Sequence, residues 1–238
     1  MNALLSMTYF GPVQWYQKLH RHQTVFIEQH DSYGKQTYRN RCVIATANGL
    51  QSLTVPVERS ADASGSDCGA RISDHGNWRH LHWHALMSAY SETPFFEYYA
   101  DDIRPFFEQR WESLYDFDMA ICRRMCELLD IRPDIRLTTE YVRPATPQTS
   151  PLAATLSQSQ ETPQTSPSPA PALLSASCFP SPGVLDLRDT INPKHPLPDA
   201  DFVPRRYYQV FERKHGFQPN LSILDLLFNM GPESILYL

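Results

Sequence analysis

The chain has 238 residues, of which 42% are hydrophobic and 12% aromatic, and its formal net charge is −5. That much apolar material is enough for a sizeable core, and the negative charge argues against a nucleic-acid binder of the bulk-charge kind. No run of about 18 apolar residues occurs, so we expect no membrane span. The apolar start at Met1–Ser6 is too short and lacks the basic region of a signal peptide, so we expect a cytoplasmic protein.

The N-terminal part of the chain predicts a strand, a helix, a strand and then a hairpin. The first three expected elements are Ala3–Met7, Pro12–His20 and Thr24–Ile27. Apolar segments at 42–47 and 50–57 flank Asn48-Gly49, which is the strongest short hairpin signal. We therefore expect a β-hairpin at about 42–57.

Helices are expected mostly from residue 77 onward, because capping signals precede several apolar stripes. The expected helices are Asn77–Tyr90, Phe95–Asp101 after Thr93-Pro94, Phe117–Leu129 capped by Asp116 or Asp118, Pro204–His215 closed by Gly216, and a short last helix opened by Ser222 and ended by Gly231-Pro232. Strands and helices interleave, so the fold class is mixed α/β with a short central sheet.

The composition changes abruptly over the segment 144–182. This segment contains nine prolines and thirteen Ser/Thr, no Lys or Arg, and one acid, Glu161. It has too little apolar surface to offset the entropy of ordering it, so we expect a disordered insertion. The 183–238 flank is close to the lower limit for a free-standing core, which predicts one globular domain built from 4–143 and 183–238.

The five cysteines, Cys42, Cys68, Cys122, Cys126 and Cys178, are odd in number and form no CxxC pair. This pattern predicts no disulfide framework. Cys122 and Cys126 share a helix face, where we expect small buried hydrophobes rather than metal ligands.

The densest polar cluster lies at residues 33–42, just before the predicted hairpin. Its candidate ligand-binding residues are Lys35, Gln36, Arg39, Asn40 and Arg41. In an extended segment Arg39 and Arg41 project to one face, where two guanidiniums can hold a phosphate or carboxylate. The alternative is a solvated edge strand whose cations pair with Glu28 and Asp31.

A second cluster, Asn77–His84, contains three histidines on a predicted helix. His80 and His84 share a face, but Leu81 stands where a zincin carries its glutamate, so we expect no metal site. His82 and His80 are candidate general bases, and Arg79 is a candidate ligand contact. The alternative is that these histidines have structural roles.

The turn Met7–Pro12 lies where the first strand passes into a helix, and Tyr9 is a candidate ligand contact there. In open α/β folds the carboxyl ends of strands border ligand crevices, and a helix N-terminus favours an anion. No dinucleotide or P-loop fingerprint is present, so no cofactor is expected. Core packing of Tyr9 and Phe10 is the competing interpretation.

An ordered series of blocks resembles the WbqC-like family. The blocks are YFGPVQWYQKL (9–19), YGKQTYRNRCVI (33–44), LTVPVE (53–58), WRHLHWHALMSAYSETPFFEYYADD (78–102) and LSILDLLFNMGPESILYL (221–238). The resemblance covers nearly all of 4–143 and 183–238. It implies an association with bacterial surface-polysaccharide (O-antigen) gene clusters and a glycine-transferring role, and it supplies no catalytic residues.

Two functions follow as hypotheses. The first is a transferase that moves an amino-acyl group to an activated sugar, with an anionic small molecule such as a sugar nucleotide as its ligand. The second is a non-catalytic accessory protein of a polysaccharide assembly complex, whose contact surface would include aromatic residues of 95–99. A third possibility, a nucleotidyl-transfer fold, depends only on the opening strand–helix–strand pattern. We expect the first hypothesis to require Tyr9, Lys35, Arg39, Arg41 and His82 in one cleft.

Overall fold

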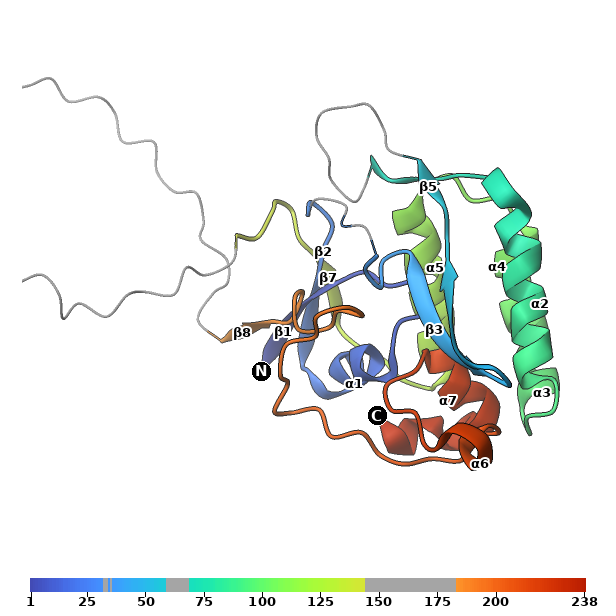
Figure 1. Cartoon of the computed structure of the whole chain (residues 1–238). Coiled ribbons are helices and arrows are strands. Elements are labelled where there is room, and N and C mark those ends of the chain that lie inside the picture. The colour runs from blue at the N-terminus through green and yellow to red at the C-terminus, as the bar shows by residue number, and fades with distance from the viewer. Residues whose placement is uncertain (32–33, 35, 59–68, 144–182) are drawn as a thin grey trace, which may run out of the picture.

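The main sheet of the fold is four-stranded and parallel, with strand order β7-β2-β1-β8 (Figure 1). Its strands are β1 (Asn2–Ser6), β2 (Thr24–Glu28), β7 (Ile135–Leu137) and β8 (Val184–Asp186). The computed structural model describes residues 1–31, 34, 36–58, 69–143 and 183–238. The mixed α/β class with a short central sheet is confirmed, whereas the predicted insertion at 144–182 lies outside the described residues.

The opening strand–helix–strand prediction is confirmed. Helix α1 (Val13–Arg21) connects β1 to β2, and Pro12 occupies its N-cap position. Trp15, Tyr16 and Leu19 are buried on this helix. Both flanking strands are almost fully buried, as in parallel strands that are covered on both faces.

The predicted hairpin is also confirmed, and it is shorter than expected. Strands β3 (Arg41–Thr46) and β4 (Gly49–Thr54) pair antiparallel, with Thr46 opposite Gly49. Gly49 has φ 109°, a conformation that the tight turn requires and that a side chain would oppose. After β4, the two-residue strand β5 (Val57–Glu58) pairs with β6 (Arg71–Ile72).

Most helices follow residue 75 in the chain. They are η2 (His75–Asn77), α2 (Trp78–Tyr90), α3 (Phe96–Ile103), α4 (Pro105–Glu108) and α5 (Leu114–Leu128). Figure 1 shows α2, α3 and α4 on the opposite side of the molecule from the parallel sheet, with the β3–β4 hairpin between them.

Of the predicted helix caps, Asn77 has the predicted N-cap position but makes no capping hydrogen bond, and the predicted cap of α5 is wrong. Asn77 precedes α2 in the left-handed conformation, with φ 47°, and its side chain makes no capping hydrogen bond. Helix α5 begins at Leu114, one turn before the predicted start, and its cap is Ser113 rather than Asp116 or Asp118. The Ser113 side chain accepts a hydrogen bond from the Asp116 backbone N–H at 3.2 Å.

The C-terminal region contains α6 (Glu212–His215), α7 (Ile223–Met230) and η3 (Gly231–Tyr237). The predicted last helix and its stop at Gly231 are confirmed. The predicted helix Pro204–His215 is wrong before Glu212, because residues 204–209 are not helical. Instead, Tyr207 and Gln209 donate hydrogen bonds to the buried carboxylate of Asp225 at 2.7 and 3.1 Å.

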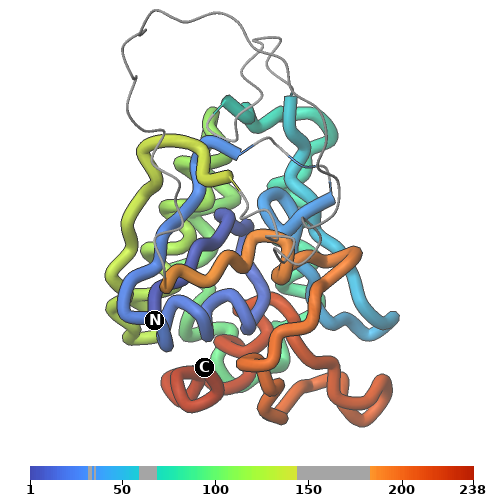
Figure 2. Tube along the Cα trace, turned by 90° about the vertical axis from the view of Figure 1, so that its left-hand side faces the viewer, coloured from blue at the N-terminus to red at the C-terminus, as the bar shows by residue number. Residues whose placement is uncertain are grey.

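The segment after residue 183 lies against the N-terminal elements, as Figure 2 also shows. Strand β8 pairs with β1, and Lys18 on α1 forms a buried ion pair with Asp199 at 2.8 Å. The hydroxyl of Ser222 donates to the Phe10 carbonyl oxygen at 2.8 Å. Contacts of this kind accord with a domain formed by both flanks, which itself stays a prediction.

Three cysteines, Cys42, Cys122 and Cys126, are buried as free thiols. Burial raises the pKa of Cys42 to well above its ordinary value, so this thiol is not a reactive nucleophile. The other two cysteines of the sequence, Cys68 and Cys178, lie outside the described residues.

Candidate functional site

The parallel sheet places the ends of β1 and β8 beside each other at one edge. Strands β2 and then β7 lie on one side of β1 in the sheet, whereas β8 pairs with the other side of β1. The loops that leave β1 and β8 therefore diverge. Such a point is where open α/β sheets form ligand crevices outside the carboxyl ends of their strands.

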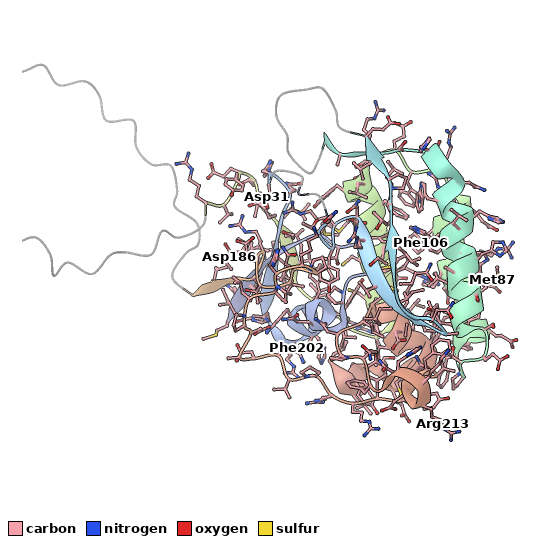
Figure 3. All side chains as sticks on the ribbon, in the orientation of Figure 1. Asp31, Met87, Phe106, Asp186, Phe202 and Arg213 are labelled. Atoms are coloured by element: carbon pink, nitrogen blue, oxygen red, sulfur yellow. The ribbon has the colours of Figure 1, made fainter. Side chains whose placement is uncertain are left out.

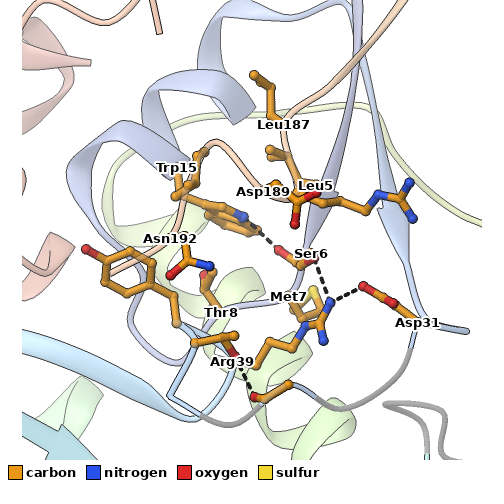
Figure 4. A pocket seen from close by; sticks show the side chains of 15 residues that line it. Leu5, Ser6, Met7, Thr8, Trp15, Asp31, Arg39, Leu187, Asp189 and Asn192 are labelled. Carbon is orange, nitrogen blue, oxygen red and sulfur yellow. Dashed lines mark hydrogen bonds and ion pairs between the residues drawn. The ribbon is translucent and has the colours of Figure 1, made fainter. Parts of the chain in front are cut away.

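A pocket of about 220 Å³ lies at this point, and we call it the switch-point pocket. Its side chains come from three segments: the end of β1 with α1, the loop at 31–39, and the loop after β8 (Figure 4). The lining residues are Leu5, Ser6, Met7, Thr8, Trp15, Asp31, Gly34, Thr37, Tyr38, Arg39, Leu187, Arg188, Asp189, Ile191 and Asn192. Two guanidiniums and two carboxylates thus meet in one small pocket.

Arg39 forms one wall of the pocket and is held in place by two neighbours. Its Nη2 donates a hydrogen bond to the Ser6 hydroxyl at 3.0 Å and forms an ion pair with Asp31. Only 8% of Arg39 is exposed. A buried guanidinium of this kind presents its N–H groups in a fixed fork that matches a carboxylate or phosphate.

Arg188 is the second guanidinium, and two carboxylates hold it. It pairs with Asp186 at 2.6 Å and with Glu28 at 3.4 Å. Burial alone would lower the pKa of Arg188, but these carboxylates outweigh burial and raise the pKa. Arg188 therefore stays charged and links the ends of β8 and β2.

The turn between β1 and α1 combines a buried hydroxyl with an unusual backbone. Thr8 is 3% exposed, and its Oγ1 has no hydrogen-bond partner among the residues that the structure describes. Phe10 has φ 40°, a left-handed conformation that costs energy for a bulky residue. Gly11 has to be glycine, because a Cβ there would approach Thr8 Oγ1 to 2.3 Å. Strained backbone beside an unpartnered polar group is typical of ligand sites.

Tyr9 and His82, two of the candidate site residues, lie in the core and not in the switch-point pocket. The Tyr9 hydroxyl is 2.9 Å from Nδ1 of His82, and Tyr9 is fully buried. Burial lowers the pKa of His82 to about 4, against the opposing effect of a backbone hydrogen bond with Thr54. His82 is therefore neutral at pH 7, and its contacts are those of a packed core residue.

The candidate residues at 35–41 do not form one site, because those after Arg39 contact the β3–β4 hairpin and not the pocket. The side-chain amide of Asn40 donates to the Val55 carbonyl oxygen at 2.9 Å, and Arg41 donates to the Thr54 hydroxyl at 3.1 Å. Both contacts secure the β3–β4 hairpin. Gln36 is exposed, and Lys35 lies outside the described residues.

The expected pairing of Arg39 and Arg41 on one strand face is wrong. Strand β3 begins only at Arg41, and the preceding residues form a turn. Arg39 also has an acidic partner, Asp31, as the structural alternative predicted. The two arginines therefore do not form one anion cradle.

His80 and Arg79 lie on α2 and line a different, open groove. The rings of His80 and His84 lie 4.0 Å apart between centroids, as the i,i+4 spacing predicts. Arg79 pairs with Asp74 at 2.5 Å and lies over the Trp78 ring. Of the candidate site residues that the structure describes, only Arg39 lines the switch-point pocket, so Tyr9, Arg39, Arg41 and His82 do not share a cleft.

The sequence reasoning missed several pocket residues, above all those of Leu187–Asn192. The available signal was the run Val184–Asp189, in which apolar strand residues are followed by Asp, Arg and Asp. This run does not reveal which strand lies beside β8 in the sheet, because that neighbour, β1, is far away in the sequence. The turn at Met7–Pro12, by contrast, pointed to the correct strand end.

Two further observations concern the described residues as a whole. Within the described part of the chain, no group of three or more His, Cys, Asp or Glu side chains is placed to hold a metal ion. None of the described helices combines the length and the apolar character that crossing a bilayer requires.

The fold and the pocket define a small α/β protein with a pocket at the switch point of a parallel sheet. The family model described as "WbqC-like protein family" matches residues 8–237, so the chain belongs to the WbqC-like family. The chain is 30% identical over 207 residues to a Mycobacterium tuberculosis (strain ATCC 25618 / H37Rv) protein described as "Uncharacterized protein Rv1507c", an alignment that covers 87% of this chain and 83% of that protein. No solved structure matches the chain.

Proposed function

We propose that the chain binds a small polar molecule with a carboxylate or phosphate group in the switch-point pocket. The observation that supports this proposal is the placement of the buried Arg39 at the crevice between β1 and β8. An incoming anion would compete with Asp31 for the Arg39 guanidinium. A pocket of about 220 Å³ suits a ligand, or a part of one, no larger than a monosaccharide or an amino acid.

We further propose that the bound molecule takes part in group transfer. The family resemblance favours an amino-acyl group moved to an activated sugar in bacterial surface-polysaccharide biosynthesis. Such a transfer needs a base for the attacking amine or hydroxyl and a positive group near the developing oxyanion. Asp189, an exposed carboxylate in the pocket lining, would accept the proton of the attacking group, and Arg39 would offset the negative charge. The bond between the acyl carbon and the leaving group of an activated acyl donor then breaks, and Asp189 returns the proton to that leaving group. His82 and His80 lie outside this pocket and have no part in the proposed step.

Ligand binding is tested by thermal melting with sugar nucleotides and amino acids at millimolar concentration. A ligand at 100 times its Kd stabilises the folded state by about 2.7 kcal/mol, which raises the melting temperature by several degrees. Arg39→Lys should abolish this rise, because an ammonium cannot replace the guanidinium fork. Arg41→Lys is the matched control, since Arg41 lies outside the pocket, and it should retain the rise. If no compound gives a rise, the binding proposal is wrong.

Transfer is tested separately with the ligand that binds. Asp189→Asn should keep the thermal rise and reduce the transfer rate at least about 100-fold, the usual scale for loss of a general base. Asp101→Asn, an exposed acid on α3, is the control and should keep the full rate. An undiminished rate in Asp189→Asn would contradict the assignment of the base.

The accessory role is the competing function. Among the aromatic residues of 95–99 only Tyr98 is strongly exposed, at 74%, whereas Phe96 and Tyr99 are buried. A single exposed aromatic ring provides little apolar area for contact with a protein partner. Ligand binding without transfer of any group would favour the accessory role.

A further inference from the structure

A second, larger concavity lies on the outer side of α2, on the opposite side of the molecule from the switch-point pocket. It has a volume of about 640 Å³ and is bordered by α2, α4 and the segments around Asp74 and Arg110. We call it the α2–α4 groove. Figure 3 shows the separation of the two sites, since Met87 of the groove and Asp31 of the pocket lie at opposite sides.

The groove carries an excess of positive charge. Arg79 and Arg110 both pair with the same carboxylate, that of Asp74, and Arg104 pairs with Glu108. These three guanidiniums and two carboxylates together have a net charge of +1. The Arg110 side chain is 82% exposed, so its remaining N–H groups are open to solvent.

An aromatic surface lies beside these cations. Trp83 is half-buried, and its ring contacts Phe107 and Phe96 with centroid distances of 5.8 and 6.0 Å. These contacts fix the indole in place. The rings of His80 and His84, whose planes are tilted by 46° to each other, line the same groove.

We propose that the α2–α4 groove binds a nucleoside diphosphate. A fixed indole favours a flat heteroaromatic ring, and the guanidiniums favour phosphate oxygens. The base would lie at Trp83 and the histidines, and the phosphates at Arg110 and Arg79, in competition with Asp74. The groove volume lies within the range of pockets that enclose ligands of this size.

ADP is the probe, titrated calorimetrically into the full chain at low salt. Arg110→Ala should weaken binding at least about tenfold, because it removes one charge-assisted contact. Asp74→Asn should tighten binding several-fold, because it removes the acid that competes with the phosphates. Arg136→Ala is the matched control: Arg136 is 63% exposed, pairs with Asp134 and lies outside the groove, so binding should not change.

Pyrophosphate and adenosine test the two halves of the ligand. ADP should bind at least about tenfold more tightly than either, if both the ring and the phosphates are recognised. Equal binding of pyrophosphate and ADP would overturn the proposal, as would no binding of ADP at millimolar concentration or an unchanged affinity in Arg110→Ala. The result is independent of the switch-point pocket: loss of ADP binding in Arg39→Lys but not in Arg110→Ala would also overturn it.

Discussion

At the scale of single residues, the two arginines that looked equivalent in the sequence have different surroundings. Arg39 is buried and paired with Asp31, whereas Arg41 is half-exposed and donates to a threonine hydroxyl. Arg39→Ala should therefore destabilise the ligand-free protein by about 3 kcal/mol, since it removes the buried guanidinium that pairs with Asp31. Arg41→Ala should cost no more than about 1 kcal/mol. Urea unfolding of both variants checks the difference, and equal losses would contradict the structural assignment.

The buried imidazole of His82 predicts a pH dependence of stability. Its pKa is lowered to about 4, so between pH 6.5 and 4 the unfolded chain binds a proton that the folded chain does not. Stability from His82 is present above pH 6.5 and is lost as the pH falls, by up to about 3 kcal/mol. His82→Gln should remove this part of the slope. The measurement is the free energy of unfolding from pH 4 to 7 for both proteins, and an unchanged slope would show that His82 is not neutral in the fold.

The buried carboxyl of Asp225 predicts a slope of the opposite sign. Burial raises its pKa to about 6 despite hydrogen bonds from Tyr207, Tyr90 and Gln209. The folded chain keeps a proton that the unfolded chain loses, so stability from this group falls as the pH rises from about 4 to 6. Relative to Asp225→Asn, the wild-type protein should become less stable by about 3 kcal/mol over that window. A difference that stays constant with pH would refute the raised pKa.

At the scale of elements, the end of α7 depends on a glycine for two reasons. Gly231 has φ 56° and ψ −130°, and a Cβ there would approach the ring of Phe95 to 2.6 Å. Gly231→Ala should therefore cost more than about 3 kcal/mol, from steric overlap as well as backbone strain. Gly76→Ala separates the two effects, since Gly76 has φ 80° with nothing within 4 Å of the added atom. It should cost only about 1 kcal/mol, and similar losses in both variants would exclude the overlap with Phe95.

The elements that the sequence predicted well depend on local signals. The β1–α1–β2 unit has a proline at the N-cap of α1 and short apolar runs, and the hairpin has Asn48-Gly49. The prediction of a helix at Pro204–His215 is wrong because tertiary contacts override local helix propensity. The side chains of Tyr207 and Gln209 donate hydrogen bonds to the buried Asp225 of α7. Among the described residues that line the switch-point pocket, Arg39 alone is a predicted site residue. The pocket depends on which strands are neighbours, and the sequence does not reveal that β8 pairs with β1.

At the scale of the whole molecule, the 144–182 segment is expected to be dispensable for stability. Its sequence has no Lys or Arg and almost no aromatic residues. The composition predicts disorder there, and shortening a loop of that kind changes the closure free energy by only about 1 kcal/mol. Replacing 146–176 with a short Gly/Ser link should move the melting temperature by only a few degrees. A fall of about 10 °C or more would mean that the segment packs against the rest of the chain.

The position of β8 in the sheet also determines the order in which the protein can form during synthesis. Strand β1 is made first, yet one of its two neighbours follows only after the 144–182 segment, near the other end of the sequence. Until the ribosome has passed Asp186, the inner strand of the sheet is a bare edge that can pair with other nascent chains. Contacts between residues so far apart in the sequence also slow folding, because the chain loses loop-closure entropy before these contacts form and stabilise it. The switch-point pocket is completed in the same late step, since the loop after β8 supplies its last wall.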